Sequence, residues 1–260
     1  MSEAWIDPRA VVHEDAELGA DVFVGPFCVV GAGVALGDRT RLESHVVLDG
    51  KLTLGPDCTV APFASLGGPP QDLKYNGEPT AVEIGARNLI KEYVTISRGT
   101  VGGGGVTRIG DDNLVMAYTH LAHDCQVGSR VVFANQATLA GHVEVGDDAT
   151  VGAAVGVHQF CRIAKHAFIG GYSTITKDAL PWVLTSGDRA VSHGINVVGL
   201  KRKGYPAETI EAIKRCYMTL FRSKLLLDEA VAKMEVDSGG VPEVRYFLDF
   251  VTSSKRGVIR

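Results

Sequence analysis

A hydrophobic residue recurs at every sixth position through most of this chain. The spacing runs without a miss over residues 6–66, resumes over 84–96 and again over 109–175, which gives 26 six-residue units. The residue that follows is glycine in 12 of these units and alanine in five. A period of six fits neither an amphipathic helix, at 3.6 residues per turn, nor a simple alternating strand. It is typical of the hexapeptide class of β-helix repeats.

The repeat predicts a mainly β fold in which each unit forms one short side of a triangular coil. The aliphatic residue points into the shaft, and the small residue after it lets the chain turn. Three six-residue units complete a coil, so residues 18 apart lie above one another at the usual strand spacing of about 4.8 Å. We expect this parallel β-helix to occupy residues 1–190 and to be stabilised by a continuous aliphatic core.

The two interruptions of the repeat predict loops near residues 67–83 and 100–108. An insertion is tolerated only where the chain can leave a corner of the coil. The second interruption contains Gly102–Gly105, but it lacks the lysine and the following helix of a phosphate-binding P-loop. We therefore do not expect phosphate binding there.

The last part of the chain has a different period. Apolar residues recur at helical spacing between Ile210 and Leu226, and a further helix is expected to start near Pro242. Residues 191–260 are therefore predicted to form a C-terminal α-helical domain. Such helices would cap the open end of the shaft, which would otherwise expose a β-edge.

Charge is distributed unevenly along the chain. Residues 1–200 carry 14 basic and 22 acidic side chains, whereas residues 201–260 carry 12 and 8. The basic tail is either a solvated helix surface or a docking surface for an acidic partner, and no nucleic acid partner is expected. No stretch is long and uncharged enough to span a bilayer, and the N-terminus lacks the apolar run of a signal peptide. Five cysteines without a C-x-x-C pair favour a reducing compartment, so a cytoplasmic protein is predicted.

The coil geometry brings several histidines together. Units that start at residues 121, 139 and 157 lie on the same side of successive coils, and each carries a histidine, with one more just before the corner. A single histidine is usually an ordinary surface residue, but neither the shaft nor the turns need four on one side. The predicted functional site therefore contains His120, His123, His142 and His158.

Two chemistries suit this cluster. In the first, His123 takes a proton from an attacking hydroxyl, Asp124 orients the ring, and the backbone N–H of Gly141 stabilises the oxyanion one coil away. In the second, three histidines bind zinc and activate water. The residues alone leave both chemistries open.

Several segments resemble one enzyme family over essentially the whole chain, the UDP-N-acetylglucosamine O-acyltransferases that begin lipid A synthesis in Gram-negative bacteria. The hexapeptide repeat is shared with many other transferases, whereas the QDLKY and HLAHDC segments are specific to this family. The matching segments are GPFCVVG (25–31), QDLKYNGEPT (71–80), RGTVGGGG (98–105), HLAHDCQVG (120–128), ATLAGHVEVG (137–146), VHQFCRI (157–163), GINVVGLKRKG (194–204) and RGVIR (256–260).

The resemblance implies transfer of a 3-hydroxyacyl group from acyl carrier protein to the 3-hydroxyl of UDP-N-acetylglucosamine. It also implies a left-handed β-helix, a homotrimer with active sites between subunits, an acyl donor carried on phosphopantetheine, and no bound cofactor or metal. His123 matches the general base, Asp124 its partner and Gly141 the oxyanion donor. Gly171 matches a position that gauges the acyl chain, where the missing side chain leaves room for a longer chain.

Two further sets of positions match binding residues of the family. The positions that contact the nucleotide sugar or the acyl phosphopantetheine are Asp72, Lys74, His120, His142, His158, Gln159, Asn196 and Arg202. The positions expected to dock the acidic carrier protein are Lys201, Lys203, Arg215, Arg222 and Lys224.

Four positions depart from the family pattern. Val198 stands where many members have glutamate, so one polar contact to the nucleotide is expected to be missing. Lys203 replaces an arginine, which keeps the charge but loses the bidentate geometry. Ser97 and Arg189 each replace a histidine. The alternatives are a zinc hydratase of the hexapeptide-repeat carbonic anhydrase type, an acetyl-CoA-dependent acyltransferase, a related N-acyltransferase, and a structural solenoid without activity.

Overall fold

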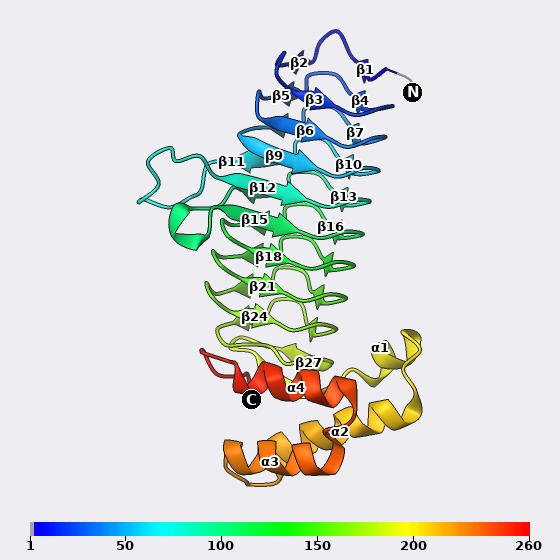
Figure 1. The fold of residues 1–260 in the computed structure, drawn as a ribbon, viewed down its shortest axis with the longest axis vertical. Coiled ribbons are helices and arrows are strands. Elements are labelled where there is room, and N and C mark those ends of the chain that lie inside the picture. The colour runs from blue at the N-terminus through cyan, green and yellow to red at the C-terminus, as the bar shows by residue number, and fades with distance from the viewer. Residues whose placement is uncertain (1–2) are drawn as a thin grey trace.

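The computed structural model describes residues 3–260, which form a long prism of stacked β-coils with a helical region at one end (Figure 1). Three sheets of short strands make the sides of the prism, and successive strands of the chain belong to successive sheets until the last two strands, which both join the same sheet. The predicted parallel β-helix of hexapeptide repeats is confirmed. Its left-handed winding stays a prediction.

The strands of the three sheets have the following bounds. Sheet A contains β1 (Trp5–Ile6), β4 (Phe23–Val24), β7 (Arg41–Leu42), β10 (Thr59–Val60), β13 (Leu89–Ile90), β16 (Leu114–Val115), β19 (Val132–Phe133), β22 (Thr150–Val151), β25 (Phe168–Ile169), β27 (Val183–Ser186) and β28 (Val191–Ile195). Sheet B contains β2 (Val11–Val12), β5 (Val29–Val30), β8 (Val47–Leu48), β11 (Ser65–Gly68), β14 (Thr95–Ser97), β17 (His120–Leu121), β20 (Thr138–Leu139), β23 (Gly156–Val157) and β26 (Thr174–Ile175). Sheet C contains β3 (Glu17–Leu18), β6 (Val34–Leu36), β9 (Lys51–Leu54), β12 (Ala81–Ile84), β15 (Val106–Ile109), β18 (Gln126–Val127), β21 (Glu144–Val145) and β24 (Arg162–Ile163).

The register of the strands follows the predicted 18-residue coil. Leu121 pairs with Leu139, and Leu139 pairs with Val157, all in parallel strands of sheet B. Within the repeat the neighbour of a residue is thus found by adding 18. The predicted stacking of the units that start at 121, 139 and 157 is confirmed.

Two residues of each unit point into the shaft. One is the aliphatic residue that sets the period, and the other stands four places later, as the buried pair Val24 and Cys28 illustrates. The second position is often filled by small side chains, because it lies inside the corner where two sides of the coil meet. Four of the five cysteines, all of them free and buried, occupy it: Cys28, Cys58, Cys125 and Cys161.

The prediction that the small residue lets the chain turn is wrong. The corner residue is the fourth of the unit, it has a positive φ, and it is usually not glycine, as at Phe27 with φ 60°. The glycine two places earlier serves close stacking instead, because a Cβ on Gly25 would lie 2.7 Å from the carbonyl oxygen of Glu43 in the next coil. A left-handed residue costs about 1–2 kcal/mol relative to the right-handed form. Its N–H is satisfied by the neighbouring coil, as His142 N–H donates to His123 O at 3.1 Å.

The corner residues form columns along the prism. At the corner between sheets A and B, consecutive rings stack with centroids 4.8–5.1 Å apart. These partly exposed rings follow the spacing of the coils and join neighbouring turns outside the shaft. The column consists of Phe27, His45, Phe63, Tyr93 and Tyr118.

Both interruptions of the repeat leave the prism at the corner between sheets B and C. Residues 69–80 connect β11 to β12, and residues 98–105, with a short 3-10 helix at Val101–Gly103, connect β14 to β15. Both loops project from the same edge (Figure 1). They therefore lie at the corner that carries the predicted histidine site in the next coils.

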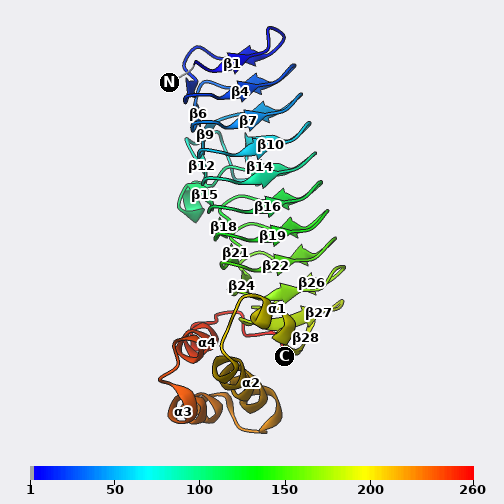
Figure 2. The ribbon, with the colours of Figure 1, turned by 90° about the vertical axis from the view of Figure 1, so that its right-hand side faces the viewer.

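The C-terminal region contributes four helices to the described residues: α1 (Val197–Arg202), α2 (Ala207–Arg222), α3 (Leu227–Ser238) and α4 (Pro242–Thr252). Figure 2 shows them at the end of the prism opposite the N-terminus. They share a second core with Trp182 and Leu180 of the last coil. The chain end also contributes, because Ile259 is buried in the core of the shaft.

The helix boundaries correct one detail of the sequence analysis. α4 begins at Pro242 as predicted, but Leu225 and Leu226 do not continue α2. The helix ends at Arg222, and the positive φ of Lys224 turns the chain toward α3. None of the helices in residues 3–260 is long and apolar enough to cross a membrane.

Candidate active site

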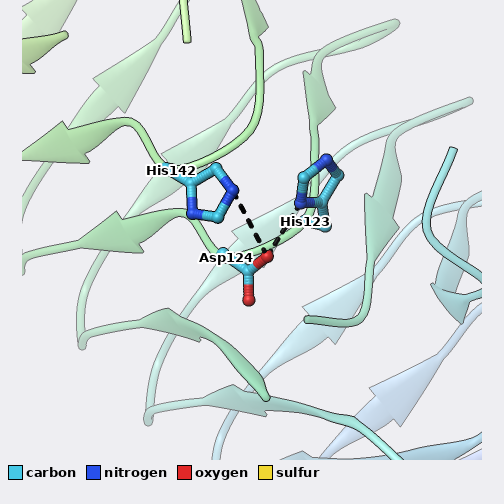
Figure 3. Close-up of side chains that lie close together, drawn as sticks. All are labelled: His123, Asp124 and His142. Carbon is cyan, nitrogen blue, oxygen red and sulfur yellow. Dashed lines mark hydrogen bonds and ion pairs between the residues drawn. The ribbon is translucent and has the colours of Figure 1, made fainter. Parts of the chain in front are cut away.

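His123 and Asp124 form the centre of the candidate site (Figure 3). They follow β17 at the corner between sheets B and C, and Asp124 is the left-handed corner residue with φ 60°. Nδ1 of His123 lies 2.8 Å from Oδ2 of Asp124. Because a carboxylate accepts, Nδ1 carries the proton and the lone pair of the ring is left on Nε2. The Asp124 side chain is 1% exposed and that of His123 is 15% exposed.

Asp124 is held by the glycine-rich loop between β14 and β15. Its Oδ1 accepts the Thr100 N–H at 2.9 Å, and its Oδ2 accepts the Thr100 hydroxyl at 2.6 Å. The loop can approach this closely only without side chains, because a Cβ on Gly103 would lie 2.1 Å from the Asp124 carboxyl carbon. On Gly99, a Cβ would lie 2.8 Å from Oδ1. These glycines therefore serve to bury a carboxylate under the loop.

His142 completes the cluster from the next coil. It is the corner residue 18 places after Asp124, its Nε2 lies 3.8 Å from Oδ2 of Asp124, and its ring packs edge-on against His123 (Figure 3). On its other side it stacks on Phe160, with ring centroids 4.4 Å apart. Burial lowers the pKa of His142, an effect opposed by the negative charges of Asp124 and Asp72. The ring is therefore expected to be neutral near neutral pH.

Gly141 lies directly over the imidazole of His123. A Cβ there would be 2.5 Å from Cε1 and 2.7 Å from Nε2 of that ring. Within residues 3–260 the Gly141 N–H makes no backbone hydrogen bond. Gly141, whose N–H has no backbone partner, therefore packs against the ring that carries the free Nε2, and the pair can supply an oxyanion donor and a base.

His120 lies beside this cluster on the outer face of sheet B. Its Nδ1 is 2.7 Å from the hydroxyl of Thr95 in the preceding coil. Burial and the nearby His123 lower the pKa of His120, so this ring is also expected to be neutral. His120 therefore offers a polar, uncharged contact next to the proposed base.

The three predicted zinc ligands are not brought together. His158 is exposed, and its Nδ1 lies 3.1 Å from the carbonyl oxygen of its neighbour Gln159. Among residues 3–260 the group with metal-binding potential is His123, Asp124 and His142, whose ligand atoms lie within 4.8 Å of one another. Two of these atoms already form the 2.8 Å hydrogen bond between His123 and Asp124. The geometry therefore fits a base and its orienting carboxylate better than a zinc-activated water.

Two of the predicted substrate contacts lie elsewhere in the chain. Asn196 and Arg202 line a cavity of about 420 Å³ over sheet A, together with Val198 and Lys203. A separate cavity of about 770 Å³ over sheet C touches Asp124 and His142. A single chain therefore does not bring Asn196 and Arg202 to His123.

The remaining predicted contacts are exposed to different degrees. Lys74 extends from the loop at 69–80, where its N–H donates to Oδ1 of the half-buried Asp72 at 3.0 Å. Leu73, between them, is fully exposed. Gly171 lies at the corner between sheets A and B, away from the histidine corner, and a Cβ there would approach Ala153 O to 3.2 Å.

The five predicted docking cations are exposed on and around α1 and α2. Two of them have partners within the chain: Nζ of Lys203 lies 2.6 Å from Oδ1 of Asp148, and Nη2 of Arg215 lies 3.3 Å from Oγ of Ser238. Lys203 is therefore a paired cation, unlike its neighbour Lys201, for which the described residues show no ion pair.

Sequence reasoning missed the residues that hold Asp124. These are Thr100 and Thr107, whose Oγ1 accepts the Asp124 N–H at 2.8 Å, and the two loop glycines Gly99 and Gly103. The available signal was the RGTVGGGG segment, which stands out among the family motifs. Its contact with Asp124 could not be inferred, because the insertion breaks the 18-residue spacing.

Known proteins share the sequence and the fold of this chain over almost its whole length. Residues 178–259 match the family described as UDP N-acetylglucosamine O-acyltransferase, domain 2, and residues 15–50 and 107–141 match bacterial transferase hexapeptide repeats. The chain is 48% identical to the acyl-[acyl-carrier-protein]–UDP-N-acetylglucosamine O-acyltransferase of Thermodesulfovibrio yellowstonii, over 98% of this chain and 99% of that protein. It resembles the solved LpxA structures of Acinetobacter baumannii (TM-score 0.96, 41% identity) and Moraxella catarrhalis (0.95, 43%), each covering 98% of this chain and 99% of the other. The chain therefore belongs to the UDP-N-acetylglucosamine O-acyltransferase family.

Proposed function

We propose that this chain moves a 3-hydroxyacyl group from the phosphopantetheine of acyl carrier protein to the 3-hydroxyl of UDP-N-acetylglucosamine, the first step of lipid A biosynthesis. Family membership supports the acceptor, and the name of the Thermodesulfovibrio yellowstonii relative supports the donor. The observation that carries the chemistry is the 2.8 Å contact between His123 and Asp124, which leaves Nε2 free. Because all five cysteines are free, we place the reaction in a reducing cytoplasm.

The proposed reaction starts with proton transfer from the acceptor hydroxyl to Nε2 of His123. The oxygen attacks the thioester carbonyl, a C–O bond forms, and the Gly141 N–H stabilises the oxyanion. Asp124 orients the ring and stabilises the imidazolium that forms. When the intermediate collapses, the C–S bond breaks and His123 returns the proton to the departing thiolate. The products are the acylated nucleotide sugar and the free thiol of the carrier.

Binding is assigned to the residues that match the family. We propose that the acidic carrier docks on the exposed cations of α1 and α2. The residues proposed to contact the nucleotide sugar or the acyl phosphopantetheine are Asp72, Lys74, His120, His142, His158, Gln159, Asn196 and Arg202. Gly171 is proposed to leave room for the end of the acyl chain. The paired cation Lys203 contributes less to docking than Lys201, because Asp148 already neutralises its charge.

An acyl-transfer assay tests the proposed substrates. With UDP-N-acetylglucosamine and 3-hydroxyacyl carrier proteins of increasing chain length, the purified protein is expected to release free carrier and form a 3-O-acylated sugar, detected by mass spectrometry. Turnover is expected to favour the longer chains of the series, given the space at Gly171. Failure to acylate this sugar with any donor would reject the proposed function, whereas a preference for the shortest chain would reject only the role of Gly171.

We propose that the complete site forms between copies of the chain in a homotrimer. The separation of the cavity at Asn196 and Arg202 from the cluster at His123 supports this, because one copy can supply each half. Mixing inactive His123→Ala with inactive Arg202→Ala subunits, after dissociation and reassembly, is expected to restore part of the activity. The mixed sample should recover up to about a quarter of the wild-type rate, and no recovery would indicate a site within one chain.

A further inference from the structure

The third corner of the prism, between sheets C and A, carries a column of alternating charges. Arg39 pairs with Asp57 at 2.6 and 2.7 Å, and Arg87 pairs with Asp112 at 2.7 and 2.8 Å. All of these are left-handed corner residues of successive coils. The pairs are largely exposed, and exposed ion pairs contribute little to stability, about 0–1 kcal/mol.

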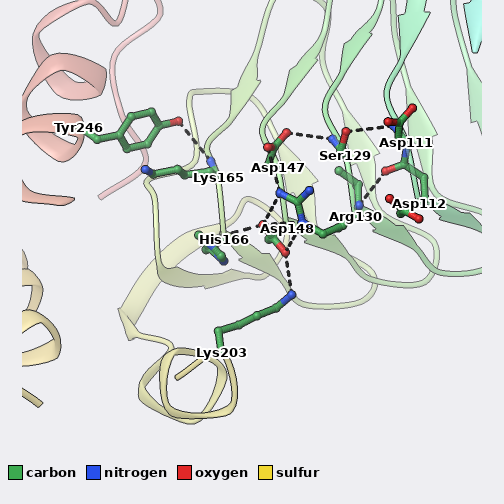
Figure 4. Close-up of polar contacts among 12 residues, drawn as sticks. Asp111, Asp112, Ser129, Arg130, Asp147, Asp148, Lys165, His166, Lys203 and Tyr246 are labelled. Carbon is green, nitrogen blue, oxygen red and sulfur yellow. Dashed lines mark hydrogen bonds and ion pairs between the residues drawn. The ribbon is translucent and has the colours of Figure 1, made fainter. Parts of the chain in front are cut away.

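Asp148, at the lower end of this column, has different surroundings. Its side chain is 10% exposed, compared with 39% for Asp57 and Asp112. The Asp148 carboxylate accepts hydrogen bonds from two cations at once (Figure 4). Nη2 of Arg130, a residue of the preceding coil, lies 3.0 Å from Oδ2, and Nζ of Lys203 lies 2.6 Å from Oδ1. Although burial acts to raise it, the hydrogen bonds from Arg130 and Lys203 hold the pKa of Asp148 below its ordinary value.

Lys203 is the residue that ends α1, so Asp148 ties this helix to the coil. A second tie follows two residues later. The hydroxyl of Tyr205 lies 3.3 Å from Nε1 of Trp182, which donates to it, and 2.9 Å from Nε2 of His166. The Tyr205 oxygen accepts from tryptophan, and its own proton can go to Nε2 of His166 when that ring is neutral. Burial lowers the pKa of His166, in agreement with a neutral ring.

The position of α1 depends on these ties together with Leu200, which is buried in the core shared with the other helices. Six residues are too few for a helix that is stable on its own. The N-cap of α1 is Asn196, whose side chain accepts the Gly199 N–H at 2.9 Å, and the C-cap is the backbone N–H of Lys203, which donates to Gly199 O. The same helix carries Arg202 into the cavity over sheet A, whose wall includes Asp148 and His166. Whatever holds α1 therefore sets where Asn196 and Arg202 stand.

We propose that Asp148 is a positioning residue for the acceptor substrate. Clamped by Arg130 on the coil, it holds Lys203, fixes α1, and so preorganises Asn196 and Arg202 in the cavity. This inference rests on the proposed function in one respect, that the cavity receives part of UDP-N-acetylglucosamine. The proposal also gives different roles to two neighbouring cations. Lys203 is neutralised by Asp148, whereas Arg202 has no ion pair among residues 3–260 and is the cation available to an acceptor phosphate.

The test compares Asp148→Asn with Asp57→Asn. Asp57 is a matched control, because it occupies the same corner position and pairs with an arginine but touches no helix. For Asp148→Asn we expect KM and Kd for UDP-N-acetylglucosamine to rise about tenfold, with kcat within about twofold of wild type. For Asp57→Asn we expect KM, Kd and kcat to stay unchanged. Kd is measured by titration calorimetry and KM by the acyl-transfer assay.

A double-mutant cycle separates positioning from general stability. Lys203→Met removes the cation that pairs with Asp148. Because the Lys203 side chain is half exposed, this variant provides the same test if Asp148→Asn does not fold. The double variant is expected to bind the acceptor no more weakly than either single variant. Unchanged Kd in Asp148→Asn, or fully additive losses in the double variant, would overturn the positioning role. If wild type itself does not bind UDP-N-acetylglucosamine, the proposed function fails instead.

Discussion

Replacing His123 by alanine is expected to lower kcat by about 10²–10⁴-fold, the usual contribution of a general base. The acceptor hydroxyl would lose a proton acceptor that the structure both orients with a buried carboxylate and leaves open at Nε2. The fold should persist, because His123 stands at a corner and not in the shaft. Initial rates of acyl transfer at saturating substrates measure the effect, with circular dichroism as the check on folding.

The control for this variant is His13→Ala. His13 lies between sheets B and C near the N-terminal end of the prism, where its side chain is about half exposed and lies against Asp15. Its replacement is expected to leave kcat within about twofold of wild type. If His123→Ala kept most of its kcat, the assignment of the base would be wrong, whatever the family relationship.

Replacing Gly141 by alanine is expected to abolish most activity through a single methyl group. The added Cβ would lie 2.5 Å from Cε1 and 2.7 Å from Nε2 of His123, closer than atoms can pack, so the imidazole must move. The ring would then lose its 2.8 Å contact with Asp124, and the lone pair would be covered. Because misplacement by about 1 Å can cost 10²-fold, we expect kcat to fall at least 10²-fold.

Gly240→Ala is the matched control for this substitution. Gly240 lies in the turn between α3 and α4, and a Cβ there meets no atom within 4 Å. The acyl-transfer activity of Gly240→Ala is expected to equal that of wild type. A crystal structure of Gly141→Ala would show whether the ring of His123 has rotated away from Asp124. Wild-type turnover with the ring displaced would contradict the assignment of His123 as the base, whereas an undisplaced ring would contradict the packing argument.

The architecture of the coil was predictable because a period of six leaves few alternatives. Leu121, Leu139 and Val157 pair as the arithmetic of 18 residues requires. The role of the glycines was not predictable in the same way. A glycine that allows a turn and a glycine that allows close stacking look alike in a sequence, and only the geometry shows that Gly25 serves stacking.

The candidate site was predictable in part. His123, Asp124 and His142 come together because all three obey the spacing of the coil. The loop residue Thr100 lies outside the repeat, so no count of residues could place it against Asp124. The pairing of Lys203 with Asp148 joins residues 55 positions apart through the helical region, and no periodicity links them.

The stacking of coils also governs how such a site can vary. His123 and Asp124 stand on one rung of the backbone ladder and Gly141 and His142 on the next, so the interval between them is that of two hydrogen-bonded strands. The distance between the two coils can change only if the backbone hydrogen bonds between their parallel strands break, and these bonds continue along the whole β-helix. Adaptation to other acyl chains or sugars must therefore proceed by substitution of side chains on an unchanged β-helix backbone, or by lengthening of the loops that leave its corners.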